Sequence, residues 1–297
     1  MPSVKLKNYL HLHLLVFIAG FTAILGELIT IGSVPLVWFR MVIAVVLIFL
    51  FIRLTKTDLK VDTKSIAKFS VAGILIALHW ITFFESIKQA NVSIALAMFS
   101  TGAFFASFIE PVFFKRKIIG YEILFGVLVI VGVWLITQSE FQYINGIILG
   151  IISALFSSLF SVINGKFVER YQASVISFYE FISGIFCISL FLLISGEGFG
   201  EGFFELIGTD WLYLFLLGSI CTAYAFIAAV YVMRHINPYT VVLTYNLEPI
   251  YGIGLAILLF PESEKMDAEF YIGALLIFST VIINGIIKNR IKAKKIV

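Results

Sequence analysis

Long apolar runs alternate with short polar segments along the whole chain of 297 residues. Each run is about 20 residues long, the length that an α-helix needs to cross roughly 30 Å of hydrocarbon. Segments such as 123–137 and 211–232 are continuously apolar and do not alternate with a period of two, which favours helices over the strands of a barrel. The pattern predicts ten membrane-spanning helices, near 9–30, 35–54, 66–87, 92–114, 118–137, 145–165, 173–195, 211–233, 239–260 and 268–287.

Composition agrees with this prediction. Hydrophobic residues make up 61% of the chain and charged residues 13%, whereas a soluble domain averages about 25% charged residues. We therefore expect an all-α membrane protein whose surroundings are a lipid bilayer. The net charge of +3 does not indicate a nucleic-acid partner, because the positive charges belong to loops beside the membrane. Cys187 and Cys221 fall inside predicted helices, where we expect them to pack as small apolar residues.

The basic residues give an orientation. Of the 21 Lys and Arg residues, all but Arg40, Lys88 and Lys265 fall on the tails and on alternate loops that share one side of the membrane. The positive-inside rule then predicts that both termini are cytoplasmic. This distribution also supports ten helices, since an odd number would scramble the alternation. The expected location is a bacterial inner (plasma) membrane, with the first helix uncleaved.

Residues 1–140 and 141–297 look like two copies of one five-helix plan. Aligning Asn91 with Asn237 brings Gly126 within one residue of Gly273. The likeness of Glu110-Pro111 to Glu248-Pro249 is out of register in that alignment, so we treat it as accidental. Because five is an odd number of crossings, the two halves must have opposite orientations. Inverted repeats of this kind are a common plan of secondary transporters, which bind their solutes near the midplane between the halves.

Several motifs carry a resemblance to a known family. They are Pro35 to Arg40 at the start of the second helix, Asn237-Pro238 followed by Leu247-Glu248-Pro249, Gly126 to Gly132, and Gly273. With the ten-helix layout, the chain resembles the EamA-type permeases of the drug/metabolite transporter superfamily. The resemblance implies export or import of small metabolites, often amino acids, without an ATPase domain.

Charged residues inside a membrane helix are expensive and are candidates for function. Glu248 lies near the middle of the ninth predicted helix, beside Pro249, which removes a helical hydrogen bond and should free a carbonyl near residue 245. Tyr245 and Asn246 add polar groups to the same turn. This group is predicted to bind an amino group or to carry a proton. The alternative is a buried glutamate that only fixes a kink.

Helices three and eight offer further candidates for the substrate site. His79, Thr82 and Ser86 share one helical face, which would line the cavity, and Trp80 is placed to cover a solute. For His79 the alternative is a hydrogen bond that packs two helices. Tyr224 is expected to project into the same cavity. Gly146, Gly150, Ser153, Ser157 and Ser161 form a stripe of small residues, which favours close helix packing.

Three more charges are predicted to gate the path. Glu27 and Arg40 lie at similar depth on either side of a tiny loop, so we expect them to form an ion pair. Glu180 occupies the matching position in the second half, where Lys166 and Arg170 are near enough in sequence to pair with it.

The sequence lacks a Walker A motif, a His-Glu-x-x-His motif and a Gly-x-Ser-x-Gly motif, and we predict no cofactor, no metal and no enzymatic activity. We expect a secondary transporter, most simply an exporter, that moves small organic metabolites such as amino acids between helices 3, 4, 6, 8 and 9. A membrane scaffold or sensor and an intramembrane lipid-modifying enzyme stay open as alternatives. A nucleotide-sugar carrier should need a basic residue midway through a helix, and the sequence places none there.

Overall fold

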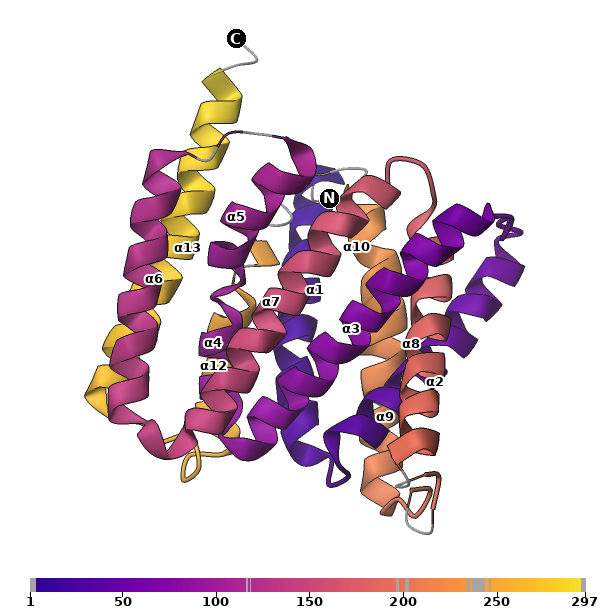
Figure 1. The fold of residues 1–297 in the computed structure, drawn as a ribbon, viewed down its shortest axis with the longest axis horizontal. Helices are drawn as coiled ribbons and strands as arrows, with labels where there is room; N and C mark the ends of the chain where they lie inside the picture. The colour runs from indigo at the N-terminus through magenta and orange to yellow at the C-terminus, as the bar shows by residue number, and fades with distance from the viewer. Residues whose placement is uncertain are drawn as a thin grey trace.

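The protein is a bundle of antiparallel helices with one interrupted layer through its centre (Figure 1). The computed structural model describes residues 4–115, 117, 119–195, 198–200, 203–233, 236, 244–245 and 247–294. In these ranges all regular structure is helical. The α-helices are α1 Val4–Leu28, α2 Ser33–Leu54, α3 Thr63–Gln89, α4 Val92–Phe99, α5 Gly102–Phe114, α6 Gly120–Ser139, α7 Ile144–Phe167, α8 Ala173–Ser195, α9 Gly208–Gly218, α10 Ala225–Met233, α12 Glu248–Leu259 and α13 Ala268–Lys294. A 3-10 turn, η1, spans Phe141–Tyr143, and a π-helical turn, η2, spans Ser219–Tyr224.

Nine apolar spans within the described ranges are long enough to cross a membrane, and the shorter helix Glu248–Leu259 is a further apolar segment. Nine of the ten predicted spans lie where the hydropathy pattern puts them. The span Gly208–Ala229 joins α9, η2 and part of α10. The predicted helix at 239–260 falls partly outside the described residues, and only its second part, α12, is seen as a helix. The first helix begins and the last helix ends at the same end of the bundle, at the top of Figure 1.

The predicted span at 92–114 is confirmed, but it is not one continuous helix, because the chain breaks at Ser100 and Thr101 between α4 and α5. Ser100 Oγ donates to the carbonyl of Leu96 at 2.9 Å, and Thr101 Oγ1 donates to that of Met98 at 2.7 Å. Hydroxyl groups that compete for backbone carbonyls bend or interrupt helices. Two such residues in succession, followed by Gly102, account for the break.

The other interruptions have similar local causes. In η2, Thr222 Oγ1 donates to the carbonyl of Leu217, five residues earlier, at 2.7 Å, which matches the wider turn of a π-helix. Pro249 lies in the first turn of α12, where its missing N–H group costs no helical hydrogen bond. Glu248 is the first residue of α12, and Thr244 and Tyr245 before it are also helical. The predicted kink involves residue 246, which lies outside the described residues.

Glycine contacts bring the helix backbones together. A Cβ atom on Gly73 of α3 would overlap the backbone of Glu180 in α8. A Cβ on Gly20 of α1 would lie 2.9 Å from the carbonyl oxygen of Glu248 in α12. On Gly132 of α6 it would lie 2.9 Å from the carbonyl oxygen of Gly273 in α13. These close approaches join α3 to α8, α1 to α12, and α6 to α13, which is the pair at the left edge of Figure 1.

Three residues of the predicted stripe on α7, Gly146, Gly150 and Ser153, pack closely against other helices, whereas Ser161 is exposed. A Cβ on Gly146 would lie 2.5 Å from that of Ala90, and a Cβ on Gly150 would lie 2.7 Å from that of Met98. Ser153 continues the same stripe with hydrogen bonds to α3. Small residues let helices approach closely when lipid supplies no hydrophobic driving force between them.

Carboxylates close the end of the bundle opposite the termini. Asp210 accepts hydrogen bonds from the backbone N–H and the hydroxyl of Thr30, at 2.9 and 2.7 Å. Glu264 accepts from the backbone N–H groups of Val92 and Ser93, both at 2.9 Å, and so caps the buried start of α4. Each of these bonds joins a residue before position 140 to one after it.

A second set of hydrogen bonds links the loops at the end that holds the termini. Tyr171 donates to the carboxylate of Asp62 at 2.8 Å, and Tyr179 donates to the carbonyl of Leu59 at 2.8 Å. Asp62 also caps α3 by accepting from Ser65. Hydrogen bonds from Ser65 and then from Tyr171 lower the pKa of Asp62 to about 2, so this exposed carboxylate stays ionised at any physiological pH.

Gly73→Ala should lower the stability of the protein. The added methyl group would overlap the α8 backbone at Glu180, and overpacking of this kind costs about 1–3 kcal/mol. Thermal unfolding in a mild detergent should show a lower midpoint. Gly254→Ala is the matched control, because its Cβ meets nothing within 4 Å and alanine favours a helix by up to about 1 kcal/mol. Equal midpoints for the two variants would contradict the close crossing of α3 and α8.

Candidate functional site

Arg40 lies at the centre of the arrangement that the structure builds from the predicted site residues. Its side chain is buried, with 3% of its surface exposed. Nε donates to Thr222 Oγ1 at 2.7 Å, and Cζ lies 3.9 Å from the centre of the Trp80 ring. Phe84 lies farther off, with its ring centre 5.6 Å from Cζ. The guanidinium is therefore held at one edge and covered on one face.

Local backbone features bring Thr222 to Arg40. Gly218 precedes the π-turn, and a Cβ there would lie 2.7 Å from Cβ of Ile43 and 3.1 Å from the carbonyl oxygen of Arg40, so α9 crosses α2 at close range. The π-turn follows immediately and turns Thr222 toward α2. Its hydroxyl then accepts from Arg40 and donates to Leu217, so both of its hydrogen-bonding functions are used.

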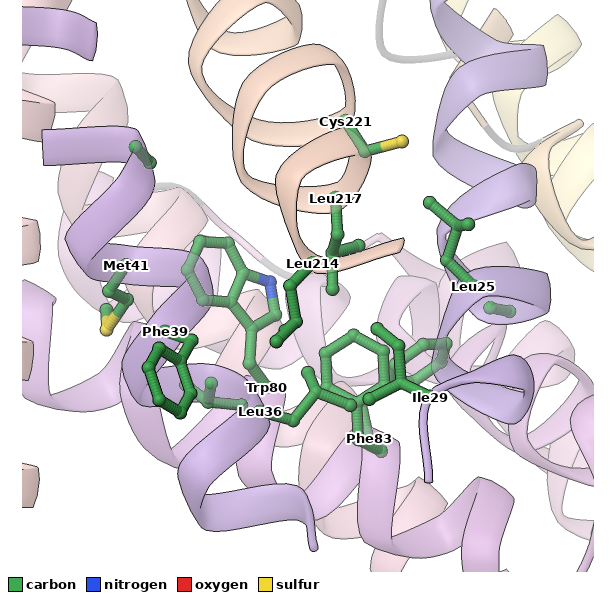
Figure 2. Close-up of a cluster of buried hydrophobic side chains, with 14 of the residues drawn as sticks. Leu25, Ile29, Leu36, Phe39, Met41, Trp80, Phe83, Leu214, Leu217 and Cys221 are labelled. Atoms are coloured by element: carbon green, nitrogen blue, oxygen red, sulfur yellow. The ribbon is translucent and has the colours of Figure 1, made fainter. Parts of the chain in front are cut away.

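Trp80 is embedded in the largest group of buried apolar side chains. Its ring lies 5.4 Å from that of Phe181 and 6.3 Å from that of Phe226. Figure 2 shows the indole among Leu36, Leu214 and Leu217, which come from α2 and α9. Packing on this scale fixes the indole plane, and a fixed ring face is what a cation–π contact to Arg40 requires.

Glu248 is the first residue of α12. It is partly accessible to solvent, and its carboxylate interacts electrostatically with Arg40 and with Tyr245. In the described part of the chain, Glu248 forms neither a side-chain hydrogen bond nor an ion pair within 4.0 Å. Tyr245 packs against the apolar group formed by α1 and α10. Asn246, the third predicted member of this turn, lies outside the described residues.

The predicted ion pair between Glu27 and Arg40 does not form. Glu27 is exposed, and its electrostatic neighbours are Glu264 and Lys88. The two residues lie at similar depth but on different faces of their helices, since Arg40 is directed toward α3 and η2. Arg40 is a buried basic residue of α2 that interacts electrostatically with Glu248.

His79 lies between α3 and α7 and also interacts electrostatically with Arg40. Its Nδ1 is 2.8 Å from Ser153 Oγ, and Ser153 Oγ donates to the carbonyl of His79 at 3.1 Å. The ring stacks on Phe99 with the centres 5.3 Å apart. This environment matches the helix-packing alternative that the sequence left open.

Tyr224 points away from the centre of the bundle. It is 41% exposed, and its hydroxyl lies 2.7 Å from Nε2 of His11 in α1. The other predicted gating residue, Glu180, is fully buried, and neither of its oxygens has a hydrogen bond of good geometry. Asn164 is its polar neighbour. The expected partner Lys166 instead donates to the carbonyl of Phe113 at 2.7 Å.

Three residues of the central region were missed by the sequence reasoning. Thr222 and Thr22 were not among the predicted site residues, and Cys221 was expected only to pack. Thr22 on α1 lies beside Cys221, which in turn interacts electrostatically with Arg40. The sequence did contain a signal for Thr222, because it is a polar residue that lies one turn after Gly218 in an otherwise apolar helix.

A pocket elsewhere in the bundle has no link to this region. It lies between α5, α6 and α13 and is lined in part by Ser107, Glu122, Thr280 and Asn284. The predicted substrate residues contribute nothing to it.

Comparison with known proteins defines the class to which this architecture belongs. The sequence profile of the EamA-like transporter family matches residues 6–138 and again residues 144–286. The chain therefore belongs to the EamA-like transporter family, within the drug/metabolite transporter superfamily, and is a multi-pass membrane transporter and not an enzyme.

Individual relatives are more distant. An uncharacterized transporter of Clostridium kluyveri is 24% identical over 237 residues, which cover 76% of this chain and 74% of the relative. A solved structure described only as a crystal structure of a protein is 14% identical, with a TM-score of 0.64 over 93% of this chain and 97% of the other. At that identity the likeness shows the fold alone.

Trp80→Leu should destabilise the protein through Arg40. A cation–π contact contributes about 0.5–2 kcal/mol, and the loss of a large buried ring adds the cost of a cavity. We expect a total loss of about 2 kcal/mol or more, measured as a lower unfolding midpoint in detergent. Trp134→Leu on α6 is the control, because Trp134 is 57% exposed and such substitutions usually change stability by less than about 0.5 kcal/mol. A midpoint for Trp80→Leu as high as that of the control would contradict the stacking of Arg40.

Proposed function

We propose that this protein is a secondary transporter that carries small organic metabolites, such as amino acids, by alternating access across a bacterial inner membrane. The observation that carries the proposal is the buried charge of Arg40, which Thr222 of η2 and Trp80 of α3 hold inside the bundle and which interacts electrostatically with Glu248 of α12. These elements come from both halves of the chain. Buried charges in a membrane are costly and mark solute pathways.

The proposal includes two inverted repeats. The numbering of the helices supports them: Glu180 lies 140 positions after Arg40, and Ala173, which starts α8, lies 140 positions after Ser33, which starts α2. Likewise Glu248 lies 146 positions after Gly102, and these residues start α12 and α5. The same offset of 146 relates Asn237 to Asn91.

Close contacts support the same correspondence. Gly73 approaches the backbone of Glu180, and Gly218, 145 positions later, approaches the backbone of Arg40. The carbonyl of Glu248 lies against Gly20 of the first helix, and the carbonyl of Gly102 accepts a hydrogen bond from Ser158 of α7 at 2.8 Å. In each of these two pairs of contacts, the residues of the second contact are the counterparts of those of the first, with the two halves exchanged. An inverted repeat requires this relation.

In the proposed cycle one half rocks against the other around this central region. The hydrogen bonds at the two ends of the bundle would then break alternately, because they join the two halves. Export is the direction we propose. A non-transporting scaffold would need none of the buried charge, which costs stability without contributing to packing.

Glu248→Gln should abolish most solute exchange. In proteoliposomes preloaded with pooled amino acids and related metabolites, the wild-type protein should take up a labelled solute saturably. Loss of a charged contact to the solute corresponds to a fall of at least about tenfold in the rate or affinity of exchange. Glu262→Gln is the control, because Glu262 is exposed in the loop after α12. Unchanged exchange in both Glu248→Gln and His79→Ala would contradict the proposed site.

Impermeant thiol labelling tests the proposed orientation. In a variant without Cys187 and Cys221, a cysteine in place of Glu262 should react on intact cells, because that loop is proposed to face outward. A cysteine in place of Lys60 should react only after the membrane is permeabilised, because the loop before α3 is proposed to be cytoplasmic. Both positions are exposed. Labelling with the reverse pattern would overturn the orientation.

A further inference from the structure

Two histidine–tyrosine pairs border the side of α1 that faces away from the bundle. His11 Nε2 lies 2.7 Å from the hydroxyl of Tyr224 in η2. His13 Nδ1 lies 3.3 Å from the hydroxyl of Tyr251 in α12. At 100° per residue, the arc of α1 between the two histidines holds its exposed apolar side chains, which are Leu6, Leu10, Leu14 and Phe17. The two pairs therefore lie at the edges of a lipid-facing strip of the protein.

Both pairs lie within the part of α1 that spans the membrane. The apolar span begins at Leu6, and a helix rises about 1.5 Å per residue, so His11 and His13 lie roughly 8 and 10 Å along the helix from that point. His13 is exposed, and Tyr224 has 41% of its surface exposed. Polar groups at this surface meet lipid, and within the hydrocarbon no water is present to bind them.

Each pair keeps one polar hydrogen that the pair itself does not use. A neutral histidine has one N–H donor and a tyrosine has one O–H donor, and the bond between them uses one of the two, whichever tautomer is present. Within the described part of the chain, neither pair forms a further side-chain hydrogen bond. Each pair thus offers one donor to a molecule that lies against α1.

A lysine adds positive charge one turn closer to the start of the helix. Lys7 is exposed and lies four residues before His11, so the two side chains share one face of α1. No acidic group of the described ranges lies within 4.0 Å of the Lys7 amine. The ligand that matches this lysine and the two pairs has a negative charge, acceptor oxygens beyond it, and an apolar remainder.

We propose that this face of α1 binds one anionic phospholipid from the leaflet at the end of the bundle that holds the termini, the top of Figure 1. The phosphate would lie at Lys7 and the ester oxygens at the two histidine–tyrosine pairs, with the acyl chains along Leu14 and Phe17. Phosphate, ester groups and chains follow one another in depth along a lipid, as these residues do along α1. Basic pockets between membrane helices bind anionic headgroups in this way.

A general aromatic belt is the alternative to a lipid site. Tyrosine is enriched wherever helices cross the membrane–water interface, and a belt of this kind has no preference among headgroups. The site predicts such a preference. A phosphatidylcholine headgroup carries its own cation beside the phosphate, which competes with Lys7, whereas a phosphatidylglycerol headgroup does not. The proposal goes beyond the proposed function and does not depend on which solute is carried.

Lipid binding to the full-length wild-type protein in mild detergent tests the proposal. The probes are phosphatidylglycerol, phosphatidylcholine with the same acyl chains, and water-soluble glycerol 3-phosphate. Native mass spectrometry measures the bound lipid, and thermal unfolding measures the stabilisation. We expect phosphatidylglycerol to bind about fivefold more tightly than phosphatidylcholine, the factor that one lysine near a membrane surface contributes. Glycerol 3-phosphate should leave the unfolding midpoint unchanged, because it has no chains to lie along α1.

Two variants assign the effect to residues. Lys7→Gln should remove the preference for phosphatidylglycerol, while Lys68→Gln should keep it, because Lys68 is an exposed lysine near the start of α3 at the same end of the bundle. Tyr224→Phe keeps the ring but removes a donor, and should weaken binding of phosphatidylglycerol by about two- to tenfold. Tyr271→Phe is its control, since Tyr271 is an exposed tyrosine on α13.

The outcomes decide between the site and the belt. Equal binding of the two lipids by the wild-type protein overturns the proposal, as does a preference that survives in Lys7→Gln. Wild-type affinity in Tyr224→Phe overturns it too. Stabilisation by glycerol 3-phosphate as large as that by phosphatidylglycerol would assign the contacts to a soluble phosphate and overturn the lipid site. If a variant does not fold, the three probes on the wild-type protein decide.

Discussion

A polar group inside a membrane has no water to bind, and this constraint decides where the helices of this protein can be interrupted. Each interruption brings its own partners. The buried start of α4 is capped by the side chain of Asn91 and by both oxygens of Glu264. Thr101 binds the carbonyl of Met98 at the break before α5, and Thr222 binds that of Leu217 in the π-turn. At these described interruptions the freed backbone groups find partners within the protein.

The same constraint applies with more force to charge, and it is met differently in the two halves. Arg40 and Glu180 hold corresponding places on α2 and α8, and each sits where a glycine of the neighbouring helix allows a close crossing. Arg40 is stabilised by a hydroxyl and a ring face. Neither carboxyl oxygen of Glu180 has a hydrogen bond of good geometry, and Asn164 is its polar neighbour. The backbone plan is repeated while the chemistry is not, so a specific solute site must lie where the halves differ.

Hydropathy was enough to predict the spans, because length and continuity of apolar residues decide whether a helix can cross a bilayer. It could not tell which face of each helix points inward. In a soluble protein the polar face of a helix marks its exposed side. Lipid is as apolar as the protein core, so the sequence pattern of α2 does not distinguish its lipid-facing side from its buried side. This is why Arg40 was placed beside Glu27 by depth alone and was found facing Trp80. Tyr224 was placed wrongly for the same reason, since its partner His11 also lies on an apolar helix.

The break before α5 was missed on different grounds. Serine and threonine are common in membrane helices and usually bond to a carbonyl one turn back without interrupting the helix. Nothing at Ser100 or Thr101 alone signals an interruption. The signal lies in the comparison of the halves, because the offset that relates Asn91 to Asn237 also relates Gly102 to Glu248, beside Pro249. Pro249 signals a helix start in the second half, and the offset of 146 residues then points to the matching helix start at Gly102 in the first half.

The two ends of the bundle are closed by contacts of unequal strength, and this bears on how a carrier cycle would run. Asp210 and Glu264 are buried, with 0% and 2% of their surfaces exposed, and their hydrogen bonds go to backbone groups that would otherwise have no partner. Breaking them leaves buried polar groups unpaired, which is costly. Asp62 and Tyr171 meet at the surface, where water replaces a lost hydrogen bond at little cost. In the proposed cycle, the end that holds the termini is therefore the one that opens more readily from this conformation, and the solute would enter there before the buried carboxylates release the opposite end.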